Sequence, residues 1–534
     1  MKKIYSIILV ISLSACTDLD LVPKNGLTEG VAFENFEGYQ GYVAKVYASL
    51  TLTGQQGPAG RGDLSIINDE GFSSYLRVYW KAQELTTDEA IIAWTDSGIR
   101  DLHSHLWGSD NQFVRVLYYR IFYTISLAND FLRIAESRPS SLSAAENAEI
   151  DNFVNEVRFI RAYAYWHALD LFRNVALLTS ITSALPSQVE PLTLFNFIES
   201  ELNSIEGDML DPGQANHYGR VDKGAAWMLQ AKLYQNAFVY IEEDRSADCI
   251  TALNKVINSG VYSLAPNYKE LFMGDNHLRT DEIIFPITHD GLLSQTWGGT
   301  TTIIRGGIGG AMMDDEKNGI PFANESTADF GVPSGWGGYR TTSALVNKFP
   351  NVAADGTSVD GRAIFYTEGQ TLEIDDVGEF TEGYAVPKFS NIEASTGQRA
   401  PGVEHVSTDY PVFRLADAYL MLAETELRSG GLSAGTLDLI NELRTRAYGD
   451  ASGNVTLADV TLDWILDERA RELYLEATRR TDLVRFNKFS GGDYIWPWKG
   501  GEKDGLSTPV HLDVFPIPAS DLIANPNLKQ NDGY

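Results

Sequence analysis

Tryptophan and arginine side chains in loop-like sequence are the residues whose chemistry stands out in this chain. A pyranose sugar has an apolar C–H face that packs on an aromatic ring, while its edge hydroxyls need hydrogen-bond donors and acceptors. Indole rings beside a guanidinium meet both needs, so the pattern favours carbohydrate binding on irregular connections. The candidates in or beside such sequence are Arg77, Trp80, Trp94, Trp297 and Trp336.

The alternative for each of these tryptophans is core packing, because aromatic side chains are usually well buried. Trp94 and Trp297 both adjoin turn-forming residues, which favours ligand contact over burial. For Trp80 and Trp336 the two interpretations are evenly balanced. Trp166 and Trp227, in contrast, fall on apolar helical stripes and are expected in the core.

Catalytic and metal-binding chemistry finds little support in the sequence. A glycosidase needs two carboxylates roughly 5–10 Å apart, but the chain has 72 acidic residues, so candidate pairs carry no information. The densest acid–base run, residues 466–472, has i,i+3 spacings typical of ion pairs on a solvated or inter-helix face. His103 and His105 have no third ligand nearby, which predicts a surface loop rather than a metal site. We therefore expect no enzymatic activity.

One acidic segment, residues 314–325, has a weak calcium-binding pattern. It places acidic and amide side chains near the positions that an EF-hand loop uses, but Pro321 follows closely and no helix clearly flanks it. Chance coincidence in an acidic chain is the preferred interpretation, so we predict no cofactor, with calcium as the alternative. The residues concerned are Asp314, Glu316, Asn318, Gly319 and Glu325.

Composition and charge restrict the class of protein and its partners. The chain of 534 residues is 44% hydrophobic and 11% aromatic, which is enough for a large folded core. Its formal net charge of −30 repels phosphate backbones and argues against nucleic-acid partners. Neutral ligands remain compatible with such a surface.

The N-terminus has the pattern of a bacterial lipoprotein signal. Lys2 and Lys3 precede an uncharged apolar run over 4–13 that is too short to cross a bilayer. The sequence Leu-Ser-Ala-Cys at 13–16 resembles a lipobox, after which Cys16 would become the acylated first residue of the mature chain. We expect residues 1–15 to be a signal peptide and Cys16 to carry a lipid anchor. The alternative is an unmodified cysteine beside an ordinary cleavage site.

Hydrophobic periodicity predicts a mostly α protein with one irregular half. Residues 16–534 are expected to form a single domain, with a helical scaffold over about 33–260 and 411–490. The intervening loop-rich insert, about 261–410, is rich in Gly, Thr, Ser and Asn and includes short β-like runs such as 282–288. Helices are predicted at 33–50, 114–136, 147–172, 192–210, 222–240, 247–260, 413–431, 432–447 and 461–489.

Five segments, in this order along the chain, resemble the SusD/RagB family of outer-membrane nutrient-binding lipoproteins: 157–172, 218–237, 413–431, 465–489 and 515–534. Together with the lipobox, the resemblance covers the whole chain. It implies four tetratricopeptide-like helical repeats that cradle an irregular ligand-binding half, without catalysis. It also implies residence on the outer face of a Gram-negative outer membrane. The implied partner is a SusC-like TonB-dependent transporter, which the lipoprotein covers like a hinged lid.

The resemblance is greatest to the starch-binding members of the family and assigns roles to individual residues. Arg77 matches a ligand-binding arginine, Trp94 a platform tryptophan and Trp297 a platform tyrosine. A second tryptophan is replaced by Ile92, and a hydrogen-bonding asparagine is lost near Asp96-Ser97. The resemblance therefore implies an α-glucan ligand, with a β-glucan such as laminarin as the runner-up. A secreted glycoside hydrolase and a structural lid without a sugar site are the remaining alternatives.

Overall fold

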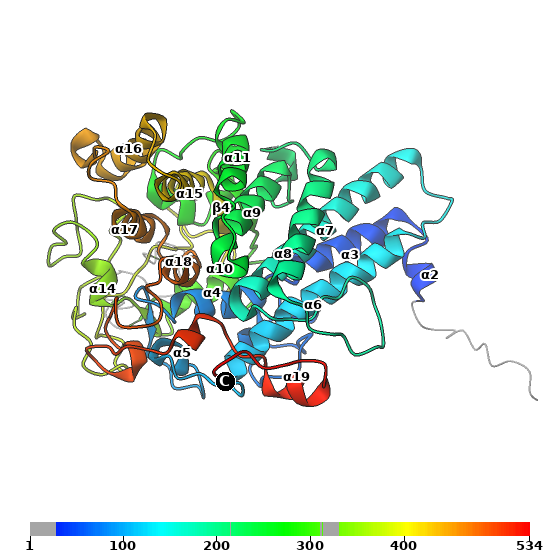
Figure 1. The fold of residues 1–534 in the computed structure, drawn as a ribbon, viewed down its shortest axis with the longest axis horizontal. Coiled ribbons are helices and arrows are strands. Elements are labelled where there is room, and N and C mark those ends of the chain that lie inside the picture. Colours follow the sequence, from blue (N-terminus) through cyan, green and yellow to red (C-terminus); the bar gives the residue numbers. More distant parts are fainter. Residues whose placement is uncertain (1–27, 214, 310–311, 313–329) are drawn as a thin grey trace, which may run out of the picture.

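The computed structural model of the protein describes residues 28–213, 215–309, 312 and 330–534 (Figure 1). The predicted signal peptide 1–15, the lipidation site Cys16 and the possible calcium segment 314–325 lie outside the described residues. Within the described ranges, no helix has both the length and the apolar character that crossing a membrane requires.

The fold is mostly helical, as the sequence predicts, with helix accounting for 46% of the structure. The longer helices fall close to their predicted ranges because their apolar stripes recur at helical spacing. The N-terminal helices are α2 (Glu29–Ala32), α3 (Phe36–Ala48), α4 (Tyr75–Glu84), α5 (Asp101–Ser104), α6 (Gln112–Ala135), α7 (Ala144–Phe172), α8 (Pro191–Ile205), α9 (Lys223–Gln235), α10 (Ala237–Ile241) and α11 (Ser246–Ile257). The C-terminal helices are α15 (Leu415–Arg428), α16 (Ala434–Tyr448), α17 (Leu462–Leu473), α18 (Arg479–Arg485) and α19 (Ala519–Ala524).

The region between α11 and α15 contains only short elements among its described residues, which agrees with the irregular half expected from composition. These elements are β2 (Ile283–Ile287), α12 (Gly299–Gly306), β3 (Tyr339–Arg340), α14 (Ser343–Val346) and β4 (Tyr410–Arg414), and one further strand, β1 (Ile91–Ile92), precedes α5. Short 3-10 helices are η1 (Glu70–Ser73), η2 (Glu206–Asp208), η3 (Ala215–His217), η4 (Tyr268–Phe272), η5 (Asn276–Leu278), η7 (Ala451–Gly453), η8 (Lys499–Gly501) and η9 (Val510–Asp513).

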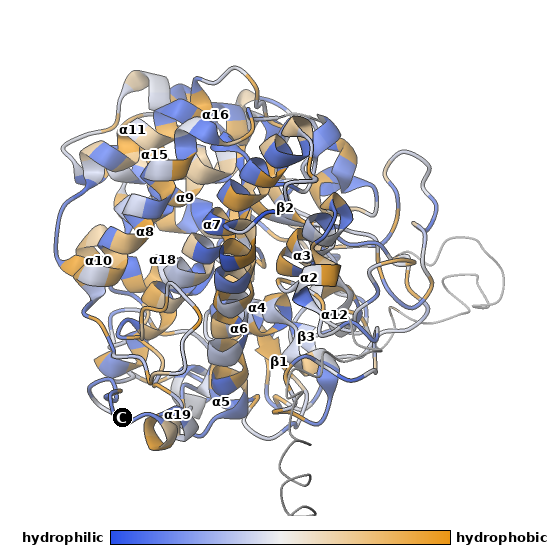
Figure 2. Ribbon diagram, turned by 90° about the vertical axis from the view of Figure 1, so that its right-hand side faces the viewer, coloured by the Kyte–Doolittle hydropathy of each residue, from blue (hydrophilic) through white to orange (hydrophobic). Residues whose placement is uncertain are grey.

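The helices pack against one another in a continuous series. Helix α6 contacts α7 and α7 contacts α8, while α9 contacts α11, α11 contacts α15, and α15 contacts both α16 and α17. On α6, Leu117, Ile121 and Ile125 recur at helical spacing and are buried in the main core. Helices such as α15 and α16 carry both hydrophilic and hydrophobic residues, as elements with one buried side do (Figure 2). The expected number of tetratricopeptide-like repeats and the single-domain boundaries stay predictions.

Two antiparallel strand pairs join parts of the chain that are far apart in sequence. β1 pairs with β3, with Ile91 opposite Arg340 and Ile92 opposite Tyr339. β2 pairs with β4, with Ile287 opposite Tyr410. The first pair is short, but it brings the residues that follow β1 next to those that precede β3.

The predicted single helix over 461–489 is wrong, because it is interrupted after α17. Leu475 and Ala477 have left-handed backbone conformations, with φ of 61° and 55°. Their amides donate hydrogen bonds to the buried carboxylates of Glu89 and Glu84, respectively. These tertiary bonds stabilise a turn that local helical periodicity cannot reveal. The predicted helix over 222–240 is likewise divided, into α9 and α10.

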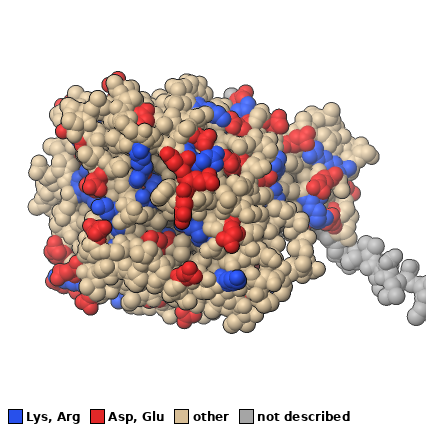
Figure 3. Space-filling model, in the orientation of Figure 1, with Lys and Arg blue, Asp and Glu red and all other residues tan. Residues whose placement is uncertain are grey.

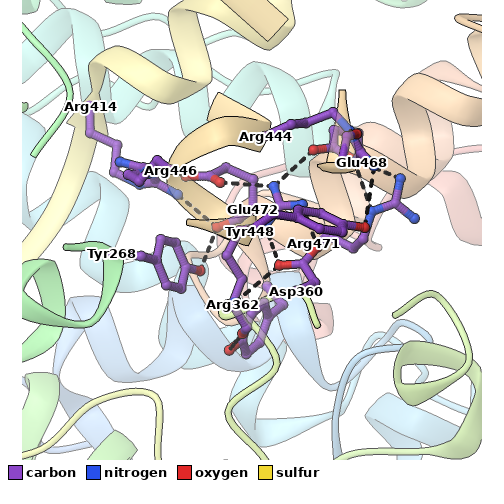
Figure 4. A network of polar contacts seen from close by, with 12 residues as sticks. Tyr268, Asp360, Arg362, Arg414, Arg444, Arg446, Tyr448, Glu468, Arg471 and Glu472 are labelled. Carbon is purple, nitrogen blue, oxygen red and sulfur yellow. Dashed lines mark hydrogen bonds and ion pairs between the residues drawn. The ribbon is translucent and has the colours of Figure 1, made fainter. Parts of the chain in front are cut away.

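The acid–base run 466–472 forms a buried ion-pair network between elements rather than a solvated one (Figure 4). Glu472 accepts hydrogen bonds from Arg362 and Arg414 at 3.0 and 2.6 Å and from Arg446. Glu468 on the same helix is paired with Arg362, Arg444 and Arg471. Burial alone would raise the pKa of Glu468, but the surrounding arginines lower it to about 2. Such fully paired carboxylates have a structural role.

Candidate functional site

One hollow of about 770 Å³ collects most of the residues proposed from the sequence. This size is within the range of small-molecule sites in proteins. Five of the seven predicted ligand-binding residues line it, although they lie on four separate stretches of the chain. The lining residues are Ala59, Gly60, Asn68, Asp69, Glu70, Phe72, Arg77, Trp94, Asp96, Trp297, Arg305 and Trp336.

The pairing of β1 with β3 places two of the three tryptophans side by side. Trp94 follows β1 closely and Trp336 shortly precedes β3, so the strand pair brings their side chains together. The amide of Ala93 donates to the carbonyl of Gly338 at 2.9 Å, extending the pairing by one bond. The Trp94 indole nitrogen Nε1 then donates to the carbonyl of Trp336 at 3.0 Å, which fixes its ring orientation.

The three indole rings of the hollow are inclined to one another. The ring centroids of Trp94 and Trp336 are 6.2 Å apart with an angle of 52° between the ring planes. Those of Trp297 and Trp336 are 6.0 Å apart at 55°. All three side chains are half-buried, so part of each ring faces the hollow. Because neighbouring ring planes are not parallel, a flat ligand cannot stack on neighbouring rings at once, whereas a ligand whose units turn can.

Arg77 supplies a fixed cation at the base of the hollow. It lies on α4, is only 4% exposed, and donates from Nη1 to the carbonyl of Trp297 at 3.2 Å. Its guanidinium carbon is 4.1 Å from the ring centroid of Phe72, within cation–π range. Burial lowers the pKa of Arg77, but an arginine remains charged at neutral pH. The guanidinium is therefore held rigidly beside the aromatic rings, as recognition of sugar hydroxyls requires.

Acidic side chains supply hydrogen-bond acceptors in the same hollow. Asp69 and Asp96 are exposed at its edge. Glu70 is half-buried and accepts hydrogen bonds from the Thr53 hydroxyl and the Ala59 amide. Both donors lie in the glycine-rich loop 53–63, so Glu70 holds this loop as a wall of the hollow.

The position of Trp80 corrects the sequence-based prediction. Its side chain is 0% exposed, and its Nε1 donates to the carbonyl of Leu475 at 3.0 Å. Trp80 therefore belongs to the core and cannot stack on a ligand. The reason is that Arg77 and Trp80 lie on a helix, not in a loop, and every residue of α4 is buried. Trp166 is buried as expected.

Ser97 also stands apart from the residues that line the hollow. It is exposed beside Asp96, and its carbonyl accepts a hydrogen bond from the Gln112 side chain at 2.6 Å.

The residues that line the hollow but were not predicted are Arg305, Phe72 and the acidic pair Asp69-Glu70, because nothing in their local sequence pattern distinguishes them.

Metal-ligating side chains do not gather anywhere in the described part of the chain. Among those residues, no group of three or more His, Cys, Asp or Glu side chains is arranged to hold a metal ion. The surface loop expected at His103 and His105 is wrong, because both side chains are buried around α5. Burial lowers the pKa of each imidazole to about 3, so both are neutral at physiological pH.

Replacing Gly338 by alanine should weaken ligand binding through Trp94. An added Cβ atom at Gly338 would lie 2.5 Å from Cε2 of the Trp94 indole, so the ring must move. We expect about a 10-fold loss of affinity for the ligand of the hollow, measured by isothermal titration calorimetry. Gly41→Ala is the control, because a Cβ at Gly41 on α3 meets nothing within 4 Å and should leave affinity unchanged. Equal affinity of both variants and the unmodified protein would contradict the role of Gly338.

Comparison of the chain with known proteins shows the family to which it belongs. The chain is 35% identical to the starch-binding protein SusD of Bacteroides thetaiotaomicron, with 100% of this chain and 99% of that protein covered. The chain belongs to the SusD family. A SusD family model also matches residues 361–534. Family membership confirms that this SusD protein is not an enzyme.

Solved structures of SusD-like proteins have the same fold at lower sequence identity. A laminarin-binding SusD-like protein is 21% identical with a TM-score of 0.65, covering 94% of this chain and 100% of that one. Surface glycan-binding protein A from Bacteroides fluxus is 16% identical with a TM-score of 0.69, covering 93% and 99%. These structures support the SusD architecture described above.

Proposed function

We propose that this SusD family protein binds a glucan in the 770 Å³ hollow, with a starch-like α-glucan as the preferred ligand. The observation that carries the proposal is the set of three indole rings, inclined by 52° and 55°, around the buried guanidinium of Arg77. A glucan whose successive rings turn can place an apolar sugar face on neighbouring indoles, whereas a flat chain cannot. Trp94, Trp297, Trp336 and Arg77 are the proposed contacts, with Asp96 as an acceptor.

The choice of an α-glucan rests on a relative that is similar over the whole chain. That protein, 35% identical, is named as starch-binding. The runner-up is a β-glucan, because a structural neighbour at 21% identity is named as laminarin-binding. Ile92, which stands where the resemblance expected a second tryptophan, is 0% exposed and contributes nothing to the hollow.

The protein acts at the cell surface in this proposal. The lipobox predicts that Cys16 is acylated, so the lipid would anchor the chain to the outer membrane of a Gram-negative bacterium. The partner is a SusC-like TonB-dependent transporter that receives the captured oligosaccharide. The net charge of −30 argues against a nucleic-acid partner. On the face shown in Figure 3, lysine and arginine side chains appear only as small separate groups.

Titration calorimetry with purified protein tests the ligand. We expect linear maltoheptaose to bind, laminariheptaose to bind more weakly, and cellohexaose, which is flat, to show no measurable heat. The same mixtures should release no reducing sugar over a day. Tighter binding of laminariheptaose would select the runner-up, while absence of binding to any glucan would refute the proposal. Release of sugar would favour a glycoside hydrolase.

A further inference from the structure

Arg305 lines the hollow next to two of the three indole rings and is anchored to two other segments of the chain. It lies near the end of α12 and is 4% exposed. Its Nε donates to the carbonyl of Ser334 at 3.0 Å, and its Nη2 donates to the Ser334 hydroxyl. Its Nη1 donates to Glu404, to the carboxylate at 2.7 Å and to the carbonyl at 3.0 Å. The guanidinium thus joins α12 to the segments around Ser334 and Glu404.

The same guanidinium contacts the faces of both neighbouring tryptophans. Its carbon atom Cζ is 5.0 Å from the ring centroid of Trp336 and 5.5 Å from that of Trp297. Both distances are within cation–π range. In addition, the Arg305 carbonyl accepts a hydrogen bond from the Trp336 amide at 2.6 Å. Arg305 therefore restrains one ring through both main chain and side chain, and the other through its side chain.

The hydrogen bonds of Arg305 indicate a different role from that of Arg77. Each of its three guanidinium nitrogens already has a protein acceptor, whereas Nε of Arg77 is buried and has no hydrogen-bond partner among the described residues. Glu404, which holds Nη1, does not line the hollow, and its side chain is 54% exposed. Glu404 can therefore affect a ligand in the hollow through Arg305 and the rings next to it.

We propose that Arg305, held by Glu404, is a positioning residue that sets the inclination of Trp297 to Trp336 and so selects strongly curved glucans. The inference rests on the proposed function and adds the residues that determine ligand shape. Without the contacts of the Arg305 guanidinium, the ring planes of Trp297 and Trp336 can become closer to parallel. A flexible linear glucan adapts to that change, because it can adjust its own torsions, whereas a closed ring of glucose units cannot.

The test compares cyclic with linear maltoheptaose, which share composition and linkage but differ in fixed curvature. By calorimetry, we expect Glu404→Gln to lower affinity for the cyclic glucan about 5-fold and for the linear glucan less than 2-fold. Arg305→Met should have a larger effect and lower the ratio of cyclic to linear affinity about 20-fold. Arg305→Lys keeps the Glu404 pair but loses the two hydrogen bonds to Ser334, so its effect on this ratio should lie between those of Glu404→Gln and Arg305→Met. General destabilisation would lower both affinities together and leave the ratio unchanged.

Asp375→Asn is the matched control, because Asp375 also forms an exposed ion pair, with Lys503, but does not line the hollow. It should leave both affinities unchanged. An unchanged ratio in Glu404→Gln and Arg305→Lys would overturn the inference while leaving the proposed function intact. If the unmodified protein binds neither glucan, the proposed function fails instead. Should Arg305→Met fail to fold, the other two variants still decide the outcome.

Discussion

Replacing Trp94 and Trp297 together by alanine should abolish measurable glucan binding. Each ring is half-buried with one face toward the hollow, and each is inclined to Trp336 between them. Truncating an aromatic anchor at the centre of a binding site costs about 2 kcal/mol or more. Each single variant should therefore lose about 30-fold in affinity for maltoheptaose, and the double variant about 1,000-fold, by titration calorimetry.

Trp227→Ala is the control for loss of a tryptophan as such. Trp227 is half-buried on α9 and donates to Glu206, and it does not line the hollow. The Trp227→Ala variant should bind glucan like the unmodified protein, although its stability decreases. If the double variant kept most of the affinity, the sugar would have to bind elsewhere, and the proposed role of Trp94 and Trp297 would be refuted. Absence of glucan binding by the unmodified protein would instead support the alternative of a lid without a sugar site.

Glu472→Ala should cause the largest loss of stability of any single charge removal discussed above. The carboxylate is 0% exposed and is paired with Arg362, Arg414 and Arg446, which would keep their charges in a buried region. Removing one partner of a buried ion pair typically costs about 3–5 kcal/mol. We expect a decrease of that size in the free energy of unfolding, measured by urea denaturation followed by circular dichroism.

Asp463→Ala is the matched control on the same helix, α17. Asp463 pairs with Lys488 at 3.8 Å, but its side chain is 81% exposed. Exposed pairs contribute roughly 0–1 kcal/mol, so this variant should unfold at nearly the same urea concentration as the unmodified protein. Similar losses for both variants would show that burial of the network does not determine its contribution.

Much of the fold could be predicted because the scaffold helices carry local signals. The stripe of Leu117, Ile121 and Ile125 is visible in the sequence at helical spacing and is buried as expected. The break between α17 and α18 could not be predicted, because its determinants are Glu84 and Glu89, almost 400 residues away in sequence. Sequence periodicity reports helix propensity but not the distant acceptors that end a helix.

The site was predicted in part for similar reasons. Trp94 and Trp297 adjoin turns, so their local sequence agrees with their place at the hollow. Trp80 looked equivalent, but it lies on a fully buried helix, which its neighbours do not reveal. Arg305 and Glu404 are 99 residues apart and hydrogen-bonded to each other, so only the folded chain shows their relation.

Arg77 lies on the fully buried helix α4, whereas the indole rings lie on connections between elements. This separation has a consequence for how SusD family proteins diversify. Arg77 is mounted on a helix without any exposed residue, so mutations there endanger folding. The indoles come instead from residues next to β1, α12 and β3 that lie outside α4. Gene duplicates can therefore acquire new sugar preferences by exchanging these connections, while the inherited architecture stays intact.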